Sequence, residues 1–180
     1  MNEHLSDVKS LRSAARAHMD RGSITDAYRA DRKRVIAVLN EALATELVCV
    51  LRYKRRYYMA DGINAAPIAA DFLQHAVEEQ DHADQIAARI VQLRGEPDFN
   101  PETLTRRSHA EYTEGTDLES MLTEDLVAER VAIASYSEIA RWLGDDDITT
   151  RRLIESIMAV EEEHAEDLLT FLQQVKRRAQ

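Results

Sequence analysis

Residues 78–86 read EEQDHADQI, and residues 160–169 read VEEEHAEDLL. Each stretch places a glutamate three residues before a histidine: Glu79 before His82, and Glu161 before His164. Each also lies in a long segment without internal glycine whose apolar residues recur with the period of an α-helix. Because residues three apart project from the same side of a helix, each pair can offer one carboxylate and one imidazole to a single ion.

Glycines and capping signals divide the rest of the chain into helices. Gly62, Gly95 and Gly144 each follow a long segment, as the C-terminal glycines of helices do. Thr116 and Glu119 form a pattern typical of a capping box, which predicts a helix start there. The apolar periodicity predicts long helices near residues 25–60, 65–94, 117–143 and 147–178, and a shorter amphipathic helix within residues 5–20.

Four long amphipathic helices predict an all-α fold in which they pack as an antiparallel-type bundle. The link over residues 95–116 is long, contains Pro97 and Pro101, and can cross the length of the bundle, whereas the other two links are short. We therefore expect a partly helical N-terminal arm over residues 1–24. Residues 25–180 are expected to form a four-helix bundle with a long crossover between its second and third helices.

The composition fits this fold and excludes several others. Gly and Pro together account for 5 and 3 of the 180 residues, which argues against an all-β architecture. The longest apolar run, residues 47–51, is far shorter than the roughly 20 residues of a membrane span, so no membrane contact is expected. The single Cys49 excludes an intrachain disulfide, and a cytoplasmic location is expected.

Charge is distributed unevenly along the chain. The net charge of −10 divides into +3 on residues 1–34 and −13 on residues 35–180. An acidic body repels nucleic acid and attracts cations, whereas a weakly basic arm could contact DNA phosphates. DNA therefore stays open as a partner of the arm.

A glutamate interrupts the apolar stripe of every predicted long helix. In chain order these residues are Glu46, Glu79, Glu129 and Glu161. The first two are 33 residues apart and the last two are 32 apart, so the chain reads as two similar helix pairs. Each pair supplies one lone glutamate and one Glu-x-x-His, which is the pattern that a two-metal site on a bundle axis requires.

Any single acid of this kind could instead be a surface residue paired with Lys or Arg at the edge of a stripe. Two Glu-x-x-His pairs are also not rare in a chain with 18 glutamates and six histidines. To explain all four glutamates as surface residues, however, this alternative would have to apply independently on each of the four helices. The cations of the first helix, Arg52, Lys54, Arg55 and Arg56, are expected to flank its stripe. Converging carboxylates in a core repel one another, so cations must neutralise them.

Two divalent cations balance the charge of four carboxylates, and both histidines would bind as neutral imidazoles. Carboxylates with one imidazole per ion suit Fe(II) or Mn(II) and also accept Zn(II). We expect two iron ions per subunit, bridged by Glu79 and Glu161. The expected terminal ligands are Glu46 with His82 on one ion, and Glu129 with His164 on the other.

Residues 39–58, LNEALATELVCVLRYKRRYY, resemble the first helix of bacterioferritins, with Glu46 at a ligand position and Tyr53 at the tyrosine near the diiron centre. EEQDHADQI, MLTEDLVAER and VEEEHAEDLL resemble the segments that carry the other ligands. The resemblance covers about residues 35–175. It implies the ferritin-like fold, a ferroxidase that uses hydrogen peroxide or dioxygen, and a hollow homo-oligomeric cage that stores ferric mineral. The implied catalytic residues are Glu46, Glu79, His82, Glu129, Glu161, His164 and Tyr53.

The chain departs from bacterioferritins in three ways. Gln80 stands where they place a haem-ligating methionine, so haem is not expected. No fifth helix is expected after the last predicted helix, and the N-terminal arm is additional. The last two features resemble Dps proteins, which form twelve-subunit shells, so 12 subunits are favoured over 24. Dps-like proteins with a bacterioferritin-type centre usually have a cysteine pair, whereas Cys49 is alone.

Other functions stay open on the sequence alone. A ferritin-like peroxidase or a manganese catalase would also carry Glu-x-x-His pairs, and a Dps-type shell could protect DNA with purely structural metals. Tyr53 either serves the site or packs in the core, and Asp125 either orients a ligand histidine or lies at the surface. His75, without a partner pattern, is expected to be an ordinary residue, and Cys49 a small buried one.

Overall fold

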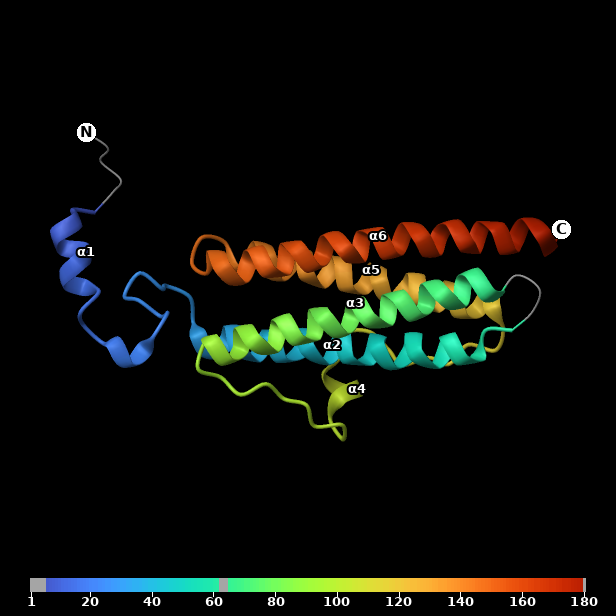
Figure 1. The fold of residues 1–180 in the computed structure, drawn as a ribbon, viewed down its shortest axis with the longest axis horizontal. Helices are drawn as coiled ribbons and strands as arrows, with labels where there is room; N and C mark the ends of the chain where they lie inside the picture. Colours follow the sequence, from blue (N-terminus) through green and yellow to red (C-terminus); the bar gives the residue numbers. More distant parts are fainter. Residues whose placement is uncertain (1–5, 62–64, 180) are drawn as a thin grey trace.

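The computed structural model describes residues 6–61 and 65–179, and these residues form helices and loops without a strand. Four long helices lie side by side along a common axis (Figure 1). They are α2 (Arg32–Met59), α3 (Ala65–Gln92), α5 (Leu118–Leu143) and α6 (Ile148–Ala179). The predicted all-α four-helix bundle is confirmed. No helix in this part of the chain combines the length and apolar character needed to cross a bilayer.

The helices are connected as two hairpins and one crossover. α2 packs along α3, and α5 packs along α6. Residues 93–117 lead back along the bundle past α2 and contain the short α4 (Leu104–Arg107) (Figure 1). This is the long crossover that the sequence predicts. The predicted helix stop at Gly62 lies outside the described residues, as do residues 1–5 of the predicted arm.

Two helix starts differ from the predicted ones. α2 begins at Arg32, not near residue 25, because the Asp31 carboxylate accepts hydrogen bonds from the second and third backbone N–H groups of the helix, at 3.1 and 3.2 Å. The capping box of α5 consists of Asp117 and Ser120, one residue beyond the predicted pair. In both cases an aspartate supplies an acceptor for N–H groups that have no partner within the helix.

The apolar core is divided into two clusters along the bundle axis. One cluster includes Leu39, Ile86, Tyr136 and Ile154. The other includes Tyr53, Phe72, Leu122 and Leu168. On every long helix a few positions separate the two clusters, and those positions hold Glu46, Glu79, His82, Glu129, Glu161 and His164. The candidate ligands therefore form one polar layer between two apolar ones. Cys49 is buried in the second cluster, as expected.

Two arginines expected to flank the first stripe are buried instead. The side chains of Arg52 and Arg56 are 2 % and 0 % exposed, and both pair with Asp125, which is 1 % exposed. Their guanidinium groups also donate to backbone carbonyls of the crossover and of the first turns of α5. The flanking position predicted for these two cations is wrong. Asp125 neither orients a histidine nor lies at the surface, because it neutralises the arginines that hold the crossover on α2.

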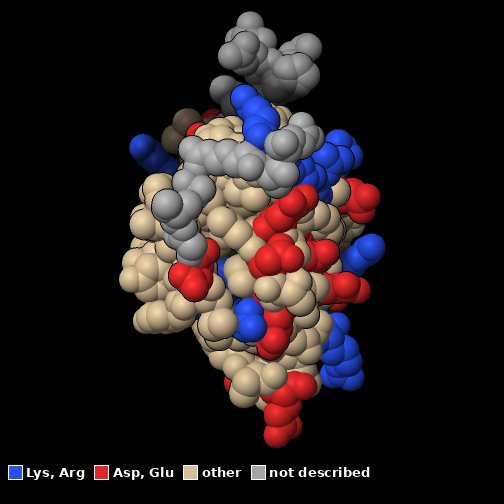
Figure 2. All heavy atoms as spheres, turned by 90° about the vertical axis from the view of Figure 1, so that its right-hand side faces the viewer, with Lys and Arg blue, Asp and Glu red and all other residues tan. Residues whose placement is uncertain are grey.

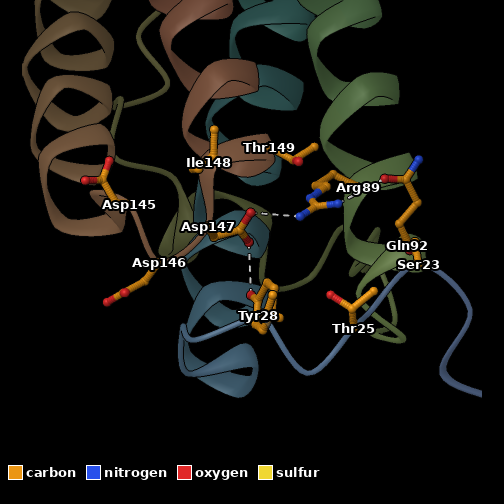
Figure 3. Close-up of a pocket in the computed structure, with 11 residues that line it drawn as sticks. Ser23, Thr25, Tyr28, Arg89, Gln92, Asp145, Asp146, Asp147, Ile148 and Thr149 are labelled. Carbon is orange, nitrogen blue, oxygen red and sulfur yellow. Dashed lines mark hydrogen bonds and ion pairs between the residues drawn. The ribbon is translucent and has the colours of Figure 1, made fainter. Parts of the chain in front are cut away.

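The N-terminal arm carries α1 (Val8–Ala14) and the one-turn helix η1 (Met19–Arg21), and neither contains a buried residue. The arm extends away from one end of the bundle (Figure 1). Beyond η1 the chain returns to the bundle and forms one wall of a pocket with the ends of α3 and α6 (Figure 3).

A single carboxylate joins the three walls of this pocket. The Tyr28 hydroxyl donates to Asp147 Oδ2 at 2.9 Å, and the Arg89 guanidinium lies 2.8 Å from Asp147 Oδ1 (Figure 3). Asp147 Oδ1 also accepts from the backbone N–H of Thr150 at 2.9 Å, which caps α6. Asp147 thus connects the segment before α2 to both hairpins.

We expect Tyr28→Phe to lower the free energy of unfolding by about 1 kcal/mol, the typical net contribution of one hydrogen bond. The ring is retained, and Asp147 keeps its contacts with Arg89 and with the start of α6. Urea unfolding followed by circular dichroism measures the change. Tyr58→Phe is the control, because Tyr58 is 80 % exposed. Equal stability of the two variants would contradict the anchoring role of the Tyr28 hydroxyl.

Candidate metal centre

Six side chains from the four long helices meet in the polar layer of the core. They are Glu46 from α2, Glu79 and His82 from α3, Glu129 from α5, and Glu161 and His164 from α6. Each of these residues is at most 4 % exposed. The helical period that places the six residues on the apolar stripes brings all of them to one level of the bundle.

His82 lies within one group of carboxylates. Its Nδ1 atom is 3.0 Å from Glu161 Oε1, 3.3 Å from Glu46 Oε2 and 3.9 Å from Glu79 Oε2. Ligand atoms of these four residues all lie within 4.8 Å of one another. A single ion can therefore contact all four residues.

His164 lies within a second group. Its Nδ1 atom is 3.2 Å from Glu161 Oε2 and 3.4 Å from Glu79 Oε1. Glu129 completes this group, whose ligand atoms again lie within 4.8 Å of one another. The two groups share Glu79 and Glu161, each of which turns one oxygen toward each histidine. Both glutamates therefore lie between the two histidines, and their role as bridges between a pair of ions stays a prediction.

Two observations indicate that these residues are suited to hold metal ions. Several buried atoms of the layer have no hydrogen-bond partner: Glu79 Oε1, Glu129 Oε2, both carboxylate oxygens of Glu161, and His164 Nδ1. The closest N···O distances around the two Nδ1 atoms span 3.0–3.4 Å. Neighbouring ligands on one ion, with bonds of about 2.1 Å, lie about 3.0–3.4 Å apart. Oxygen and imidazole donors of this kind suit iron, manganese or zinc.

Protons can also balance the charge of this layer. Burial, followed by repulsion from Glu161 and Glu46, raises the pKa of Glu79 well above its ordinary value. Burial and the charge of Glu161 likewise raise the pKa of Glu129. Both carboxyl groups therefore hold a proton to a higher pH than an exposed glutamate does, and a bound cation would replace that proton.

The pKa values of the two histidines and of Glu161 are shifted in the direction opposite to the one that burial alone would cause. Burial alone would lower the pKa of His82, but the close contacts of its ring with the Glu161 and Glu46 carboxylates outweigh burial and raise the pKa to about 10. His164 behaves in the same way, because Glu161 raises its pKa against the effect of burial. Burial would raise the pKa of Glu161, yet its close contacts with both histidines lower it to about 2. Protons on these histidines must leave when cations bind.

Two tyrosines donate hydrogen bonds to Glu129 and Glu46, the glutamates that each belong to only one of the two groups. The Tyr53 hydroxyl donates to Glu129 Oε1, so Tyr53 lies at the site, as predicted. The Tyr136 hydroxyl donates to Glu46 Oε1, and both tyrosines are almost fully buried. Sequence reasoning assigned Tyr136 to the apolar stripe and missed its polar role. Its position one helical repeat after Glu129 was the available signal.

Two further residues of α3 contact His164, and the sequence indicated neither. Glu78 Oε2 is 2.8 Å from His164 Nε2, on the side of the ring away from the metal ligands. The His75 ring stacks on the His164 ring, with centroids 3.9 Å apart and an interplanar angle of 19°. The expectation that His75 is an ordinary residue is therefore wrong. Its position seven residues before His82 was the signal that places it on the same face of α3.

Known proteins share this sequence pattern. Residues 36–178 match the ferritin-like domain family. The chain is 33 % identical over 138 residues to the bacterioferritin of Desulfovibrio desulfuricans, covering 76 % of this chain and 73 % of that protein. It is 30 % identical over 138 residues to the bacterioferritin of Rhodobacter capsulatus, covering 76 % of this chain and 81 % of that protein.

Solved structures share the fold. The TM-score is 0.80 with a dodecameric thioferritin, the bacterioferritin-related protein from Bacteroides fragilis, at 34 % identity over 84 % of this chain and 91 % of that chain. It is 0.72 with the Desulfovibrio desulfuricans bacterioferritin, whose diiron site was solved in different catalytic states, at 28 % identity over 81 % and 82 % of the two chains. It is 0.75 with Dps from Thermosynechococcus elongatus, which at 21 % identity over 78 % and 90 % of the two chains shows the fold alone.

Proposed function

This chain belongs to the ferritin-like family, and on that premise we propose that it stores iron, which it oxidises at a diiron ferroxidase centre inside each subunit. The observation that carries this function is the polar layer in which two overlapping ligand groups share Glu79 and Glu161. The matched relatives are bacterioferritins, which do not favour the alternative of a peroxidase or a manganese catalase.

Each residue of the layer has a definite part in this proposal. Glu46 with His82 and Glu129 with His164 serve as terminal ligands, and Glu79 and Glu161 as bridges. Iron bound by these residues would supply the electrons that reduce the oxidant, one from each Fe(II) as it becomes Fe(III). Fe(II) is at the same time the substrate that the cage accumulates. Manganese or zinc would be accepted by the same donors.

The surrounding residues orient the ligands. The hydroxyl groups of Tyr53 and Tyr136 donate to Glu129 and Glu46, so each terminal carboxylate keeps its other oxygen for an ion. Glu78 accepts the Nε2 proton of His164, which leaves Nδ1 of that ring free to bind metal. Both apolar clusters exclude water from the layer and strengthen its electrostatic interactions.

The assembly is a homo-oligomeric cage, and we propose that it has 12 subunits. The similarity to a dodecameric thioferritin at 34 % identity and over 91 % of that chain supports this number over 24. Dioxygen or hydrogen peroxide as the oxidant, DNA as a partner of the arm, and the absence of haem stay predictions.

The proposed function is tested by iron loading. Metal-free protein that receives Fe(II) anaerobically and then oxidant should form a ferric core of many iron atoms per subunit. Under native conditions the core should elute with a particle of about 246 kDa, twelve times the 20.5 kDa chain. A particle of about 492 kDa would overturn only the subunit number. Oxidation that ends at two irons per subunit, with no mineral, would contradict storage.

A further inference from the structure

A further group of side chains that could hold a metal ion lies outside the candidate diiron centre. It consists of Asp71 and His75 from α3 and Asp167 from α6, whose ligand atoms lie within 4.8 Å of one another. Asp71 belongs to the second turn of α3, one helical turn before His75. None of these residues belongs to the six ligands described above.

His75 is held between the diiron ligands and this group. Its ring stacks on His164 at 3.9 Å and meets the edge of Tyr53 with centroids 5.1 Å apart. The His75 side chain is only 2 % exposed, and its Nδ1 atom has no hydrogen-bond partner. An imidazole buried with one nitrogen unpaired forfeits the hydrogen bonds that water would supply. The other ring nitrogen, Nε2, faces Asp71 and is the atom that an ion in this group would bind.

The contact between His75 and Asp71 is longer than a hydrogen bond. His75 Nε2 lies 3.5 Å from Asp71 Oδ2, and that oxygen is itself buried without a hydrogen-bond partner. A hydrogen bond between these atoms would be about 2.7–3.2 Å long. Two ligands on a transition-metal ion with bonds of about 2.1 Å lie about 3.0–3.4 Å apart. The observed 3.5 Å is about 0.3 Å longer than the hydrogen-bond range but only about 0.1 Å longer than the range for two ligands on one ion, so it is closer to the second.

Asp167 opens this group to solvent. It is exposed, whereas Asp71 is 15 % exposed and His75 is buried, so exposure falls stepwise toward the diiron centre. Acidic side chains also gather on the end of the bundle at which α3 begins and α6 ends (Figure 2). Such a surface raises the local concentration of cations.

We propose that Asp71, His75 and Asp167 bind a third divalent transition-metal ion, separated from the diiron centre by the stacked rings of His75 and His164. Two carboxylates and one imidazole are suitable donors for Fe(II), Mn(II), Co(II) or Zn(II). Metal binding rests on these contacts alone. The use of the site as a waiting position for Fe(II) before oxidation rests on the proposed function.

Equilibrium dialysis of the metal-free full-length protein against Co(II), without oxidant, tests this site by metal content. The wild type should bind one more Co(II) per subunit than the double variant Asp71→Asn/Asp167→Asn. His75→Phe keeps an aromatic ring in the stack but removes the ligand nitrogen, and it should lose the same ion. The matched control is Asp84→Asn/Glu162→Gln, which removes one exposed acid from each of the same two helices and should bind as the wild type does.

The outcomes separate this proposal from the proposed function. Equal Co(II) content in the wild type and both site variants overturns the third site, while two ions per subunit in all of them leaves the diiron centre intact. A loss of one ion in the control as well overturns the assignment to these residues, because it reports only general surface charge. A wild type that binds no Co(II) contradicts both proposals.

Discussion

Glu161→Gln is expected to lower the initial rate of Fe(II) oxidation at least about 100-fold. Glu161 lies close to both histidines, with Oε1 3.0 Å from His82 Nδ1 and Oε2 3.2 Å from His164 Nδ1. The amide replaces one anionic oxygen by an NH₂ group, which donates and cannot bind a cation, so the bridge is lost. Mutating residues that only orient metal ligands already costs about 10- to 100-fold. Losing a ligand shared by two ions should cost more.

Stopped-flow absorbance of the ferric product, at two Fe(II) per subunit, measures this rate. Glu162→Gln is the matched control, because it removes the same charge from the adjacent, exposed position of α6. It should oxidise iron at nearly the wild-type rate. If Glu161→Gln, with unchanged helical content and particle size, stays within tenfold of the wild type, Glu161 does not bridge the ions.

The four helices and the six candidate ligands could be predicted because the helical period of the apolar residues both defines the helices and shows which side chains point into the core. A core stripe recurs every three or four residues, so an acid such as Glu46 within the stripe must point into the core. The short links then align the hairpins, which brings Glu46 to the level of His82 and Glu129 to the level of His164. Spacing along each helix was therefore enough to place these residues in one layer.

Contacts between distant segments could not be predicted in this way. Arg52 and Arg56 lie on the first stripe, but their partners are Asp125 and carbonyl groups of the crossover and of α5, up to 73 residues away. No periodicity reports where a long loop lies. The roles of Tyr136 and His75 failed for a related reason. In a sequence, a tyrosine or histidine on an apolar stripe cannot be distinguished from a residue that only packs in the core, because its polar partner is known only from the structure.

The metal-free protein is expected to lose stability as the pH rises from 6 to 9, whereas bound metal should stabilise it more over the same range. Folding raises the pKa of His82 from 6.5 to about 10. The stability that this proton confers is complete below pH 6.5 and is lost progressively as the pH rises toward 10. Folding also raises the pKa values of Glu79 and Glu129 above 4.5. The stability that their protons confer is therefore also lost as the pH rises, and this loss begins at a lower pH than for His82.

Glu161 does not oppose this trend in the range considered. Its pKa falls from 4.5 to about 2, so the stability that it confers is present above pH 4.5 and is lost only as the pH falls toward 2. Each group that keeps its proton only in the folded state lowers the free energy of unfolding by about 1.4 kcal/mol per pH unit. A metal ion displaces these same protons, so its affinity increases with pH.

Thermal unfolding in EDTA and in excess Zn(II), between pH 6 and pH 9, measures both effects. Zn(II) is the probe because it has no redox chemistry, and at 1,000 times its dissociation constant it adds about 4 kcal/mol per site. The midpoint in EDTA should fall with pH, and the difference between Zn(II) and EDTA should widen. In Glu161→Gln, which lacks the shared ligand, the difference should be much smaller at every pH. A difference that is constant or narrows with pH would mean that metal does not replace the protons of His82, Glu79 and Glu129.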